Sequence, residues 1–210
     1  MKKIYLSPSD QWSNLTTVAG MSEAKQCKMI ADKCEEIFRR HNYIVKVGDN
    51  SKEKTFAKRA KESNDFKSDI HICIHTNAGG GVGTMVLCHP TRVTNEYVNS
   101  IYERVAKLTP TKDKGIFPRK DLYEINQTNA LCVYVEVDFH DNFDAENWIL
   151  NNIDNVAMAI CKGVFDIDEK EATPIYRVQV GAFADKHNAE ILCDTLRNRG
   201  FKDAFIVTRG

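Results

Sequence analysis

A histidine at the end of an apolar strand is the first sign of chemistry in this sequence. Residues 70–75 alternate isoleucine with His71, Cys73 and His75, a period of two that is typical of a β-strand. A polar pair and the glycines at 79–81 follow. Because open α/β sheets keep their sites where strands end, His75 would place a metal-binding imidazole at such an edge. A lone histidine at a strand end can equally be a simple hydrogen-bonded residue.

Two glutamates could share that site. Glu136 lies between Val135 and Val137 in an otherwise apolar segment, so its carboxylate needs a partner or a function. Glu23 would lie in the first turn of a helix, where the helix dipole already favours an acid. A zinc hydrolase needs a metal with an open coordination position and a carboxylate that takes a proton from water. A neutral histidine, a carboxylate ligand and a separate glutamate meet that requirement.

The elements that must position these residues alternate between strand and helix. This alternation predicts an α/β fold with an open, mostly parallel sheet flanked by helices over residues 1–165. In such a fold Glu23, His75 and Glu136 would meet at one end of the sheet. The predicted strands are 3–6, 43–47, 70–75, 83–89 and 132–137. Four helices are predicted: one capped by Ser22, an exposed polar helix at 55–64, one at 94–108 and a last long helix capped by Asp144.

Composition excludes several classes of protein. The 29 basic and 29 acidic residues balance, so no excess charge points to nucleic acid or an anionic membrane. No stretch is long enough to span a membrane. The first residues, MKKIYLSP, lack the apolar segment of a signal peptide, which predicts synthesis in the cytoplasm without one. The seven cysteines lack close-ligand spacing and are expected to be small buried residues of a protein made in a reducing compartment.

The last part of the chain differs in composition. Residues 166–173 are acidic and end before Pro174, which predicts a linker. Residues 174–210 read as a small βαβ module that is too small to bury its own faces comfortably. Its expected elements are a strand at 176–183, a helix at 188–199 and a strand at 204–207.

Two segments resemble motifs of the zinc-dependent N-acetylmuramoyl-L-alanine amidases of the amidase-3 type. Residues 72–78, ICIHTNA, are similar to their SIHxNA motif, and residues 133–142, VYVEVDFHDN, to their LVExGFxxN motif. The resemblance implies that Glu23 and His75 bind zinc and that Glu136 is the general base. It also implies peptidoglycan as substrate, cut at the amide between N-acetylmuramic acid and the L-alanine of the stem peptide.

The turn after the first strand departs from that family. The family usually has a zinc-binding histidine in a DPGHGG turn, whereas residues 7–14, SPSDQWSN, contain none and resemble an SPSxQ branch of clostridial and phage lytic enzymes. Gln11, through its side-chain oxygen, is the expected third ligand. Asp10 aligns with the histidine if no gap is allowed, and a carboxylate is the better zinc ligand, so both stay open. A degenerate site would instead make the protein a non-catalytic wall-binding or regulatory protein, and a zinc carboxypeptidase would use similar ligands on another fold.

Further polar residues near these motifs have expected roles. Asn77, His140 and Asn142 are expected substrate contacts, His140 near the tetrahedral intermediate. His71 is expected to be a core histidine rather than a neighbour of the metal ligands, and His89 a loop residue. The glycines at 79–81 are not followed by GK[ST], so they are expected to admit a glycan rather than a phosphate.

The tail resembles the first half of a SPOR domain, a module that binds peptidoglycan glycan. One βαβ half predicts a homodimer through residues 174–210, and packing on the chain's own catalytic domain is the alternative. The resemblance as a whole implies a phage endolysin or a sporulation autolysin, released through a holin or on mother-cell lysis. Its expected partner is peptidoglycan, with no nucleic acid and no membrane.

Overall fold

The computed structural model describes residues 1–51, 55–171, 178–202 and 204–207. The chain divides into two compact units, Met1–Glu171 and Ala172–Gly210. Among the described residues, no helix is both long and apolar enough to cross a membrane.

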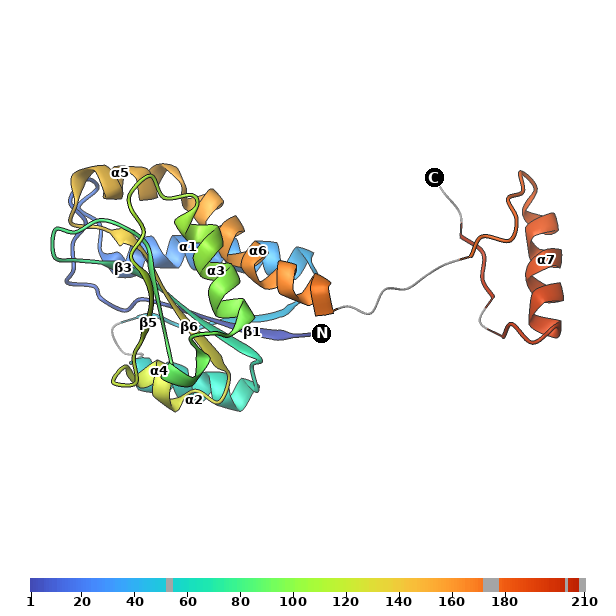
Figure 1. The fold of residues 1–210 in the computed structure, drawn as a ribbon, viewed down its shortest axis with the longest axis horizontal. Coiled ribbons are helices and arrows are strands. Elements are labelled where there is room, and N and C mark those ends of the chain that lie inside the picture. The colour runs from blue at the N-terminus through green and yellow to red at the C-terminus, as the bar shows by residue number, and fades with distance from the viewer. Residues whose placement is uncertain (52–54, 172–177, 203, 208–210) are drawn as a thin grey trace. The chain divides into compact units, whose positions relative to one another are not determined.

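A six-stranded sheet forms the centre of the first unit (Figure 1). Its strands are β1 (Lys3–Pro8), β2 (Ile44–Val47), β3 (Ile70–Asn77), β4 (Met85–Cys88), β5 (Gly115–Pro118) and β6 (Leu131–Phe139). They are ordered β2-β1-β3-β6-β4-β5, and the β4–β6 pair is antiparallel while the other pairs are parallel. This confirms the predicted open, mostly parallel sheet.

Helices cover both faces of the sheet. The helices of this unit are α1 (Glu23–Arg40), α2 (Phe56–Phe66), α3 (Glu96–Ala106), α4 (Tyr123–Gln127), α5 (Phe143–Asn151) and α6 (Ile153–Glu171). Figure 1 shows α1, α3, α5 and α6 on one face and α2 and α4 on the other. The large apolar core lies under the first group, and a smaller cluster of Cys73, Leu87, Ile125 and Cys132 lies on the side of α4.

Local sequence explains where these helices begin. The side chain of Ser22 accepts a hydrogen bond from the backbone of Lys25, which confirms it as the N-cap of α1 and satisfies a donor the helix leaves unpaired. Glu23 is therefore the first residue of α1, next to the end of β3. Thr55 caps α2 in the same way.

The helix expected after Asp144 is two helices. Its N-cap is Asn142 rather than Asp144, because the side-chain oxygen of Asn142 accepts from the backbone of Asp144 and Ala145. α5 ends at Asn151, Asn152 is its C-cap, and α6 begins at Ile153.

Most of the predicted linker is also helical. α6 continues to Glu171 because its last turns have partners that an acidic composition does not reveal. Ile167 is 3% exposed, Asp166 accepts a 2.7 Å hydrogen bond from Nε of Arg104, and Asp168 accepts from the hydroxyls of Tyr43 and Tyr97.

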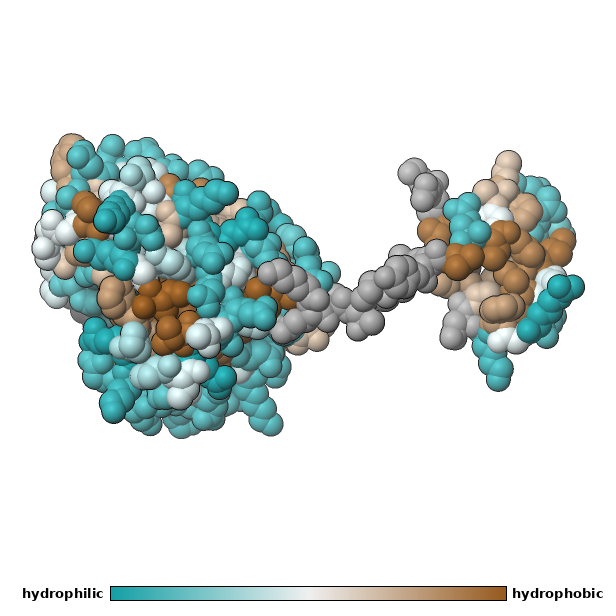
Figure 2. Space-filling view, in the orientation of Figure 1, coloured by the Kyte–Doolittle hydropathy of each residue, from teal (hydrophilic) through white to brown (hydrophobic). Residues whose placement is uncertain are grey.

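The described part of the second unit contains one helix, α7 (Lys186–Asn198), capped by Asp185. The predicted strands are not formed at 178–183 or 204–207, and the rest of the first one, 176–177, lies outside the described residues. A strand needs a neighbour for its backbone groups, and here the apolar side chains remain exposed as well. Figure 2 shows this apolar surface on the unit, and its exposed residues include Val178, Val180, Phe183, Ile191, Phe201, Phe205 and Val207.

All seven cysteines are free and buried, as expected from their apolar sequence positions.

Candidate active site

The parallel strands β1, β3 and β6 bring the predicted residues to one edge of the sheet. His75 lies near the end of β3, and Glu136 is its register partner on β6. α1 starts at the same edge with Glu23. The three side chains that the sequence predicts to meet do lie together, because parallel neighbours end at the same side.

Glu23 and His75 form a buried pair. Their exposed fractions are 1% and 4%, and Oε1 of Glu23 lies 2.9 Å from Nδ1 of His75. Burial alone would raise the pKa of Glu23, but the hydrogen bond and charge of His75 outweigh burial, and that pKa is lowered. Burial alone would lower the pKa of His75, but Glu23 and Glu136 raise it.

Glu136 lies beside this pair with one buried oxygen unused. Its Oε2 has no hydrogen-bond partner among the described residues. Burial raises the pKa of Glu136 to about 7, with the charge of Glu23 adding to the effect and the charge of His75 opposing it. A carboxyl group whose pKa lies near neutral pH suits proton transfer.

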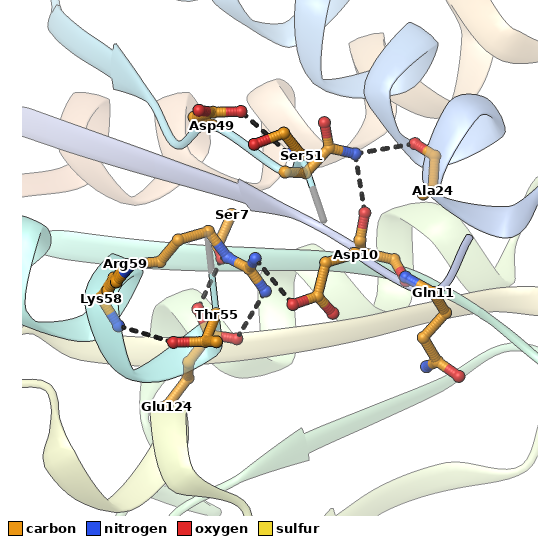
Figure 3. Close-up of polar contacts among 12 residues, drawn as sticks. Ser7, Asp10, Gln11, Ala24, Asp49, Ser51, Thr55, Lys58, Arg59 and Glu124 are labelled. Atoms are coloured by element: carbon orange, nitrogen blue, oxygen red, sulfur yellow. Dashed lines mark hydrogen bonds and ion pairs between the residues drawn. The ribbon is translucent and has the colours of Figure 1, made fainter. Parts of the chain in front are cut away.

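The turn after β1 separates its two candidate ligands. Nη1 of Arg59 lies 3.1 Å from the carboxylate of Asp10, and Nε of Arg59 donates to the hydroxyl of Ser7 at 2.8 Å. Arg59 is 1% exposed and also lies 3.5 Å from Glu124 (Figure 3). Asp10 is therefore held by a buried cation, while the side chain of Gln11 points away from that pair (Figure 3).

Asn14 connects Gln11 to the glutamate at the start of α1. Its amide nitrogen donates to Oε1 of Gln11 and lies 3.2 Å from Oε2 of Glu23. Asn14 was not predicted as a site residue, because a polar residue in a turn belongs to no periodic pattern.

Arg59 and Glu124 were also missed. The predicted polar helix at 55–64 was expected to be exposed, but α2 buries Arg59, Ala60 and Ser63. This expectation was wrong because the buried cation is compensated by Asp10 and Glu124, which come from distant parts of the chain.

Two of the three expected substrate contacts have other partners. His140 is 2% exposed, its Nδ1 lies 3.0 Å from the hydroxyl of Thr76, and it is 4.0 Å from Oε2 of Glu23. The side-chain oxygen of Asn142 caps α5. Asn77 is partly exposed at the end of β3, and its oxygen accepts from the backbone of Ala78.

The neighbouring loops are held in place by ordinary contacts. Asp141 accepts hydrogen bonds from the backbone of Gly79 at 2.6 Å and Gly80 at 2.9 Å, which fixes the glycine loop against the end of β6. His71 is buried, as expected, and His89 accepts from the backbone of Thr91 in a short 3-10 turn, Pro90–Arg92.

The donors at this edge fit a zinc ion. Two ligands of one tetrahedral zinc lie about 3.3 Å apart, close to the 2.9 Å between Glu23 and His75. Oε2 of Glu136 is buried without a partner in the described part of the chain, a cost that water on a bound ion would relieve.

Most of the chain matches a known protein family. The family model of N-acetylmuramoyl-L-alanine amidase, Amidase_3, matches residues 10–166. The chain belongs to this amidase family. The model of the SPOR domain matches residues 159–208. Both resemblances seen in the sequence are thereby confirmed.

Individual amidases are distant relatives of this chain. N-acetylmuramoyl-L-alanine amidase CwlM of Bacillus licheniformis is 26% identical over 162 residues, 74% of this chain and 63% of the relative. The sporulation-specific N-acetylmuramoyl-L-alanine amidase of Bacillus subtilis is 24% identical over 156 residues, 71% of this chain and 61% of the relative. The chain thus spans about three fifths of these curated relatives.

A solved amidase shares the fold. The N-acetylmuramoyl-L-alanine amidase from Clostridium difficile 630 superposes with a TM-score of 0.73 at 17% identity, and the match covers 81% of this chain and 98% of that one. The shared fold places the edge described above at the end of a sheet common to these amidases.

Proposed function

We propose that this protein hydrolyses peptidoglycan at the amide between N-acetylmuramic acid and the L-alanine of the stem peptide. The observation that carries the proposal is Glu136, a half-buried glutamate with a pKa near 7 beside the Glu23–His75 pair. Membership in the amidase family supports the same reaction.

We propose that zinc is held by Gln11, Glu23 and His75. The ion pair of Asp10 with Arg59 supports Gln11 over Asp10 as the third ligand, and the link through Asn14 places Gln11 next to Glu23. When bound, zinc supplies Lewis acidity for the scissile carbonyl and the attacking water.

Glu136 does the proton transfer in this proposal. Its carboxylate takes a proton from the attacking water and passes it to the leaving amine of the alanine. Asn77, partly exposed at the end of β3, is the predicted contact best placed to orient the substrate.

The test is the variant Glu136→Gln, which keeps the shape of the side chain and removes the base. We expect unchanged zinc content and a fall of about a hundred- to ten-thousand-fold in the release of N-terminal alanine from purified walls. Glu103→Gln, an exposed glutamate on α3, is the matched control. Near-normal release by Glu136→Gln would contradict the assignment of the base.

The missing histidine favours one other candidate, a wall-binding protein whose metal site is degenerate. It predicts a purified protein without zinc that binds walls and releases no alanine. Stoichiometric zinc together with alanine release would exclude it.

We propose that the tail binds the cell wall and forms a homodimer. The SPOR match supports wall binding, and the exposed apolar side chains of the tail would be covered by a second copy. The enzyme would act on the wall as an endolysin or a sporulation autolysin after release by a holin or by mother-cell lysis.

A further inference from the structure

A second group of metal-binding side chains lies on the α4 side of the sheet. It consists of His71 and Cys73 on β3 and Cys132 on β6, where Cys132 is the register partner of His71. His71 precedes His75 by four residues, about 13 Å along the strand. Cys73 precedes His75 by two residues, about 7 Å, so the group lies further from the ends of the strands than the candidate active site does.

The spacing of the two sulfur atoms suits a shared metal ion. Sγ of Cys73 and Sγ of Cys132 lie 3.9 Å apart, and two thiolates on one tetrahedral zinc are separated by about 3.8 Å. A ring nitrogen of His71 and both sulfurs lie within 4.8 Å of one another. Three potential ligand atoms therefore lie within reach of one zinc ion.

His71 is oriented in the way that metal-binding histidines are. Its Nε2 lies 3.2 Å from Oε1 of Glu124, and its ring stacks on Tyr5 with centroids 5.0 Å apart. Glu124 itself is fixed by the hydroxyl of Ser7 at 2.5 Å and by Arg59. A carboxylate on one ring nitrogen sets the tautomer and leaves the other nitrogen free to bind a metal.

The other ring nitrogen of His71 has no partner. Nδ1 makes no hydrogen bond among the described residues, and the whole side chain of His71 is buried, so bulk water does not reach this atom. An unsatisfied buried polar atom is costly, and a metal ligand bond removes that cost.

Charge and surroundings also suit zinc. Cys73 and Cys132 are 0% and 4% exposed, in an apolar cluster with Leu87 and Ile125. Two thiolates neutralise a divalent ion, so a loaded site would place no net charge in that cluster. Zinc accepts two cysteines and one histidine with a fourth position for water.

We propose that His71, Cys73 and Cys132 bind a zinc ion that links β3 to β6, further from the ends of these strands than the candidate active site. The proposal does not depend on the amidase reaction. It differs from the expectation that these cysteines only fill the core.

The first test is the zinc content of the purified full chain and three variants. We expect two zinc ions per chain in the wild type. The double variant Cys73→Ser/Cys132→Ser should retain one, and His75→Ala should retain the other. Cys34→Ser/Cys161→Ser is the matched control, because it removes another neighbouring pair of buried thiols that has no histidine beside it, and it should retain both.

A second measurement keeps both cysteines in place, so that its outcome does not depend on the folding of the double variant. After exchange with cobalt, the wild type and His75→Ala should show thiolate-to-cobalt charge-transfer absorption. Absence of this absorption band from the wild type would overturn the proposal. So would a wild-type chain that binds one zinc ion and loses it in His75→Ala. A Cys73–Cys132 disulfide in the purified protein would overturn it too. Loss of one zinc in the cysteine variant alone would support this site and contradict the one proposed for catalysis.

Discussion

Asp10 and Gln11 are the two candidate metal ligands in the turn after β1, and the carboxylate of Asp10 is paired with a buried arginine. The neighbouring Gln11 is joined through Asn14 to Glu23. The oxygen of Gln11, one residue further along the turn than Asp10, is therefore the one available to a metal.

Replacing Gln11 by histidine tests this difference. We expect Gln11→His to bind zinc more tightly than the wild type, because an imidazole is a better zinc ligand than a neutral amide oxygen. Competition with a chelator would measure the change. Asp10→Asn is the control and should leave zinc affinity within a few-fold, whereas a large loss in Asp10→Asn would make Asp10 the ligand.

Arg59 is the single side chain whose removal should cost most stability near the site. Arg59→Met leaves the carboxylates of Asp10 and Glu124 without their cation, and breaking a buried pair costs about 3–5 kcal/mol. Urea unfolding would measure the loss. Arg40→Met, an exposed pair partner of Glu36, should change stability little, and equal losses in the two variants would contradict the role given to Arg59.

At the scale of elements, the last turns of α6 belong to the catalytic unit rather than to a linker. Asp168 accepts hydrogen bonds from Tyr43 and Tyr97 and pairs with Lys2. These contacts join the end of α6 to the start of β1, to the segment before β2 and to α3.

Asp168→Asn should loosen this end of the helix. Hydrogen bonds to a charged group contribute about 1.5–3 kcal/mol, and partial exposure places the expected loss at the low end. Burial alone would raise the pKa of Asp168, but its hydrogen bonds to Lys2, Tyr43 and Tyr97 lower it. The stability from this group is therefore present above the ordinary aspartate pKa and is lost as the pH falls through the lowered one.

The measurement is urea unfolding of wild type and Asp168→Asn at several pH values. The difference between them should shrink as the pH falls below about 4. Asp154→Asn, an exposed carboxylate at the start of α6, is the control. A difference that grows on acidification would contradict the assigned sign.

At the scale of the whole molecule, the two units differ in how much of their apolar surface they bury. The first unit has a continuous apolar core, whereas the described residues of the second leave most of their large apolar side chains exposed. Small modules bury a low fraction of their surface, and we therefore predict that a partner covers these side chains of the tail.

Deleting residues 172–210 should leave an amidase unit that keeps its unfolding midpoint and its hydrolysis of soluble wall fragments. Binding to intact walls should weaken, because a linked wall-binding module raises the effective concentration of the enzyme at its substrate. Sedimentation should show a dimer for the full chain and a monomer for the truncated one. A monomeric full chain at micromolar concentration would contradict the homodimer.

The sequence by itself determined the parts of this protein that depend on short-range pattern. Strand and helix periods predicted the mostly parallel sheet, Ser22 predicted the start of α1, and Glu23, His75 and Glu136 were expected to meet. Each of these features follows from periodicity, from helix capping or from the common edge of parallel strands. All three can be predicted from short stretches of sequence.

Tertiary structure alone decided the features that depend on distant partners. Arg59 is buried because Asp10 and Glu124 meet it, and residues 166–171 are helical because Tyr43, Tyr97 and Arg104 hold them. A segment whose composition predicts exposure or flexibility becomes ordered when its charged side chains are paired with distant parts of the fold. No local sequence pattern records that pairing.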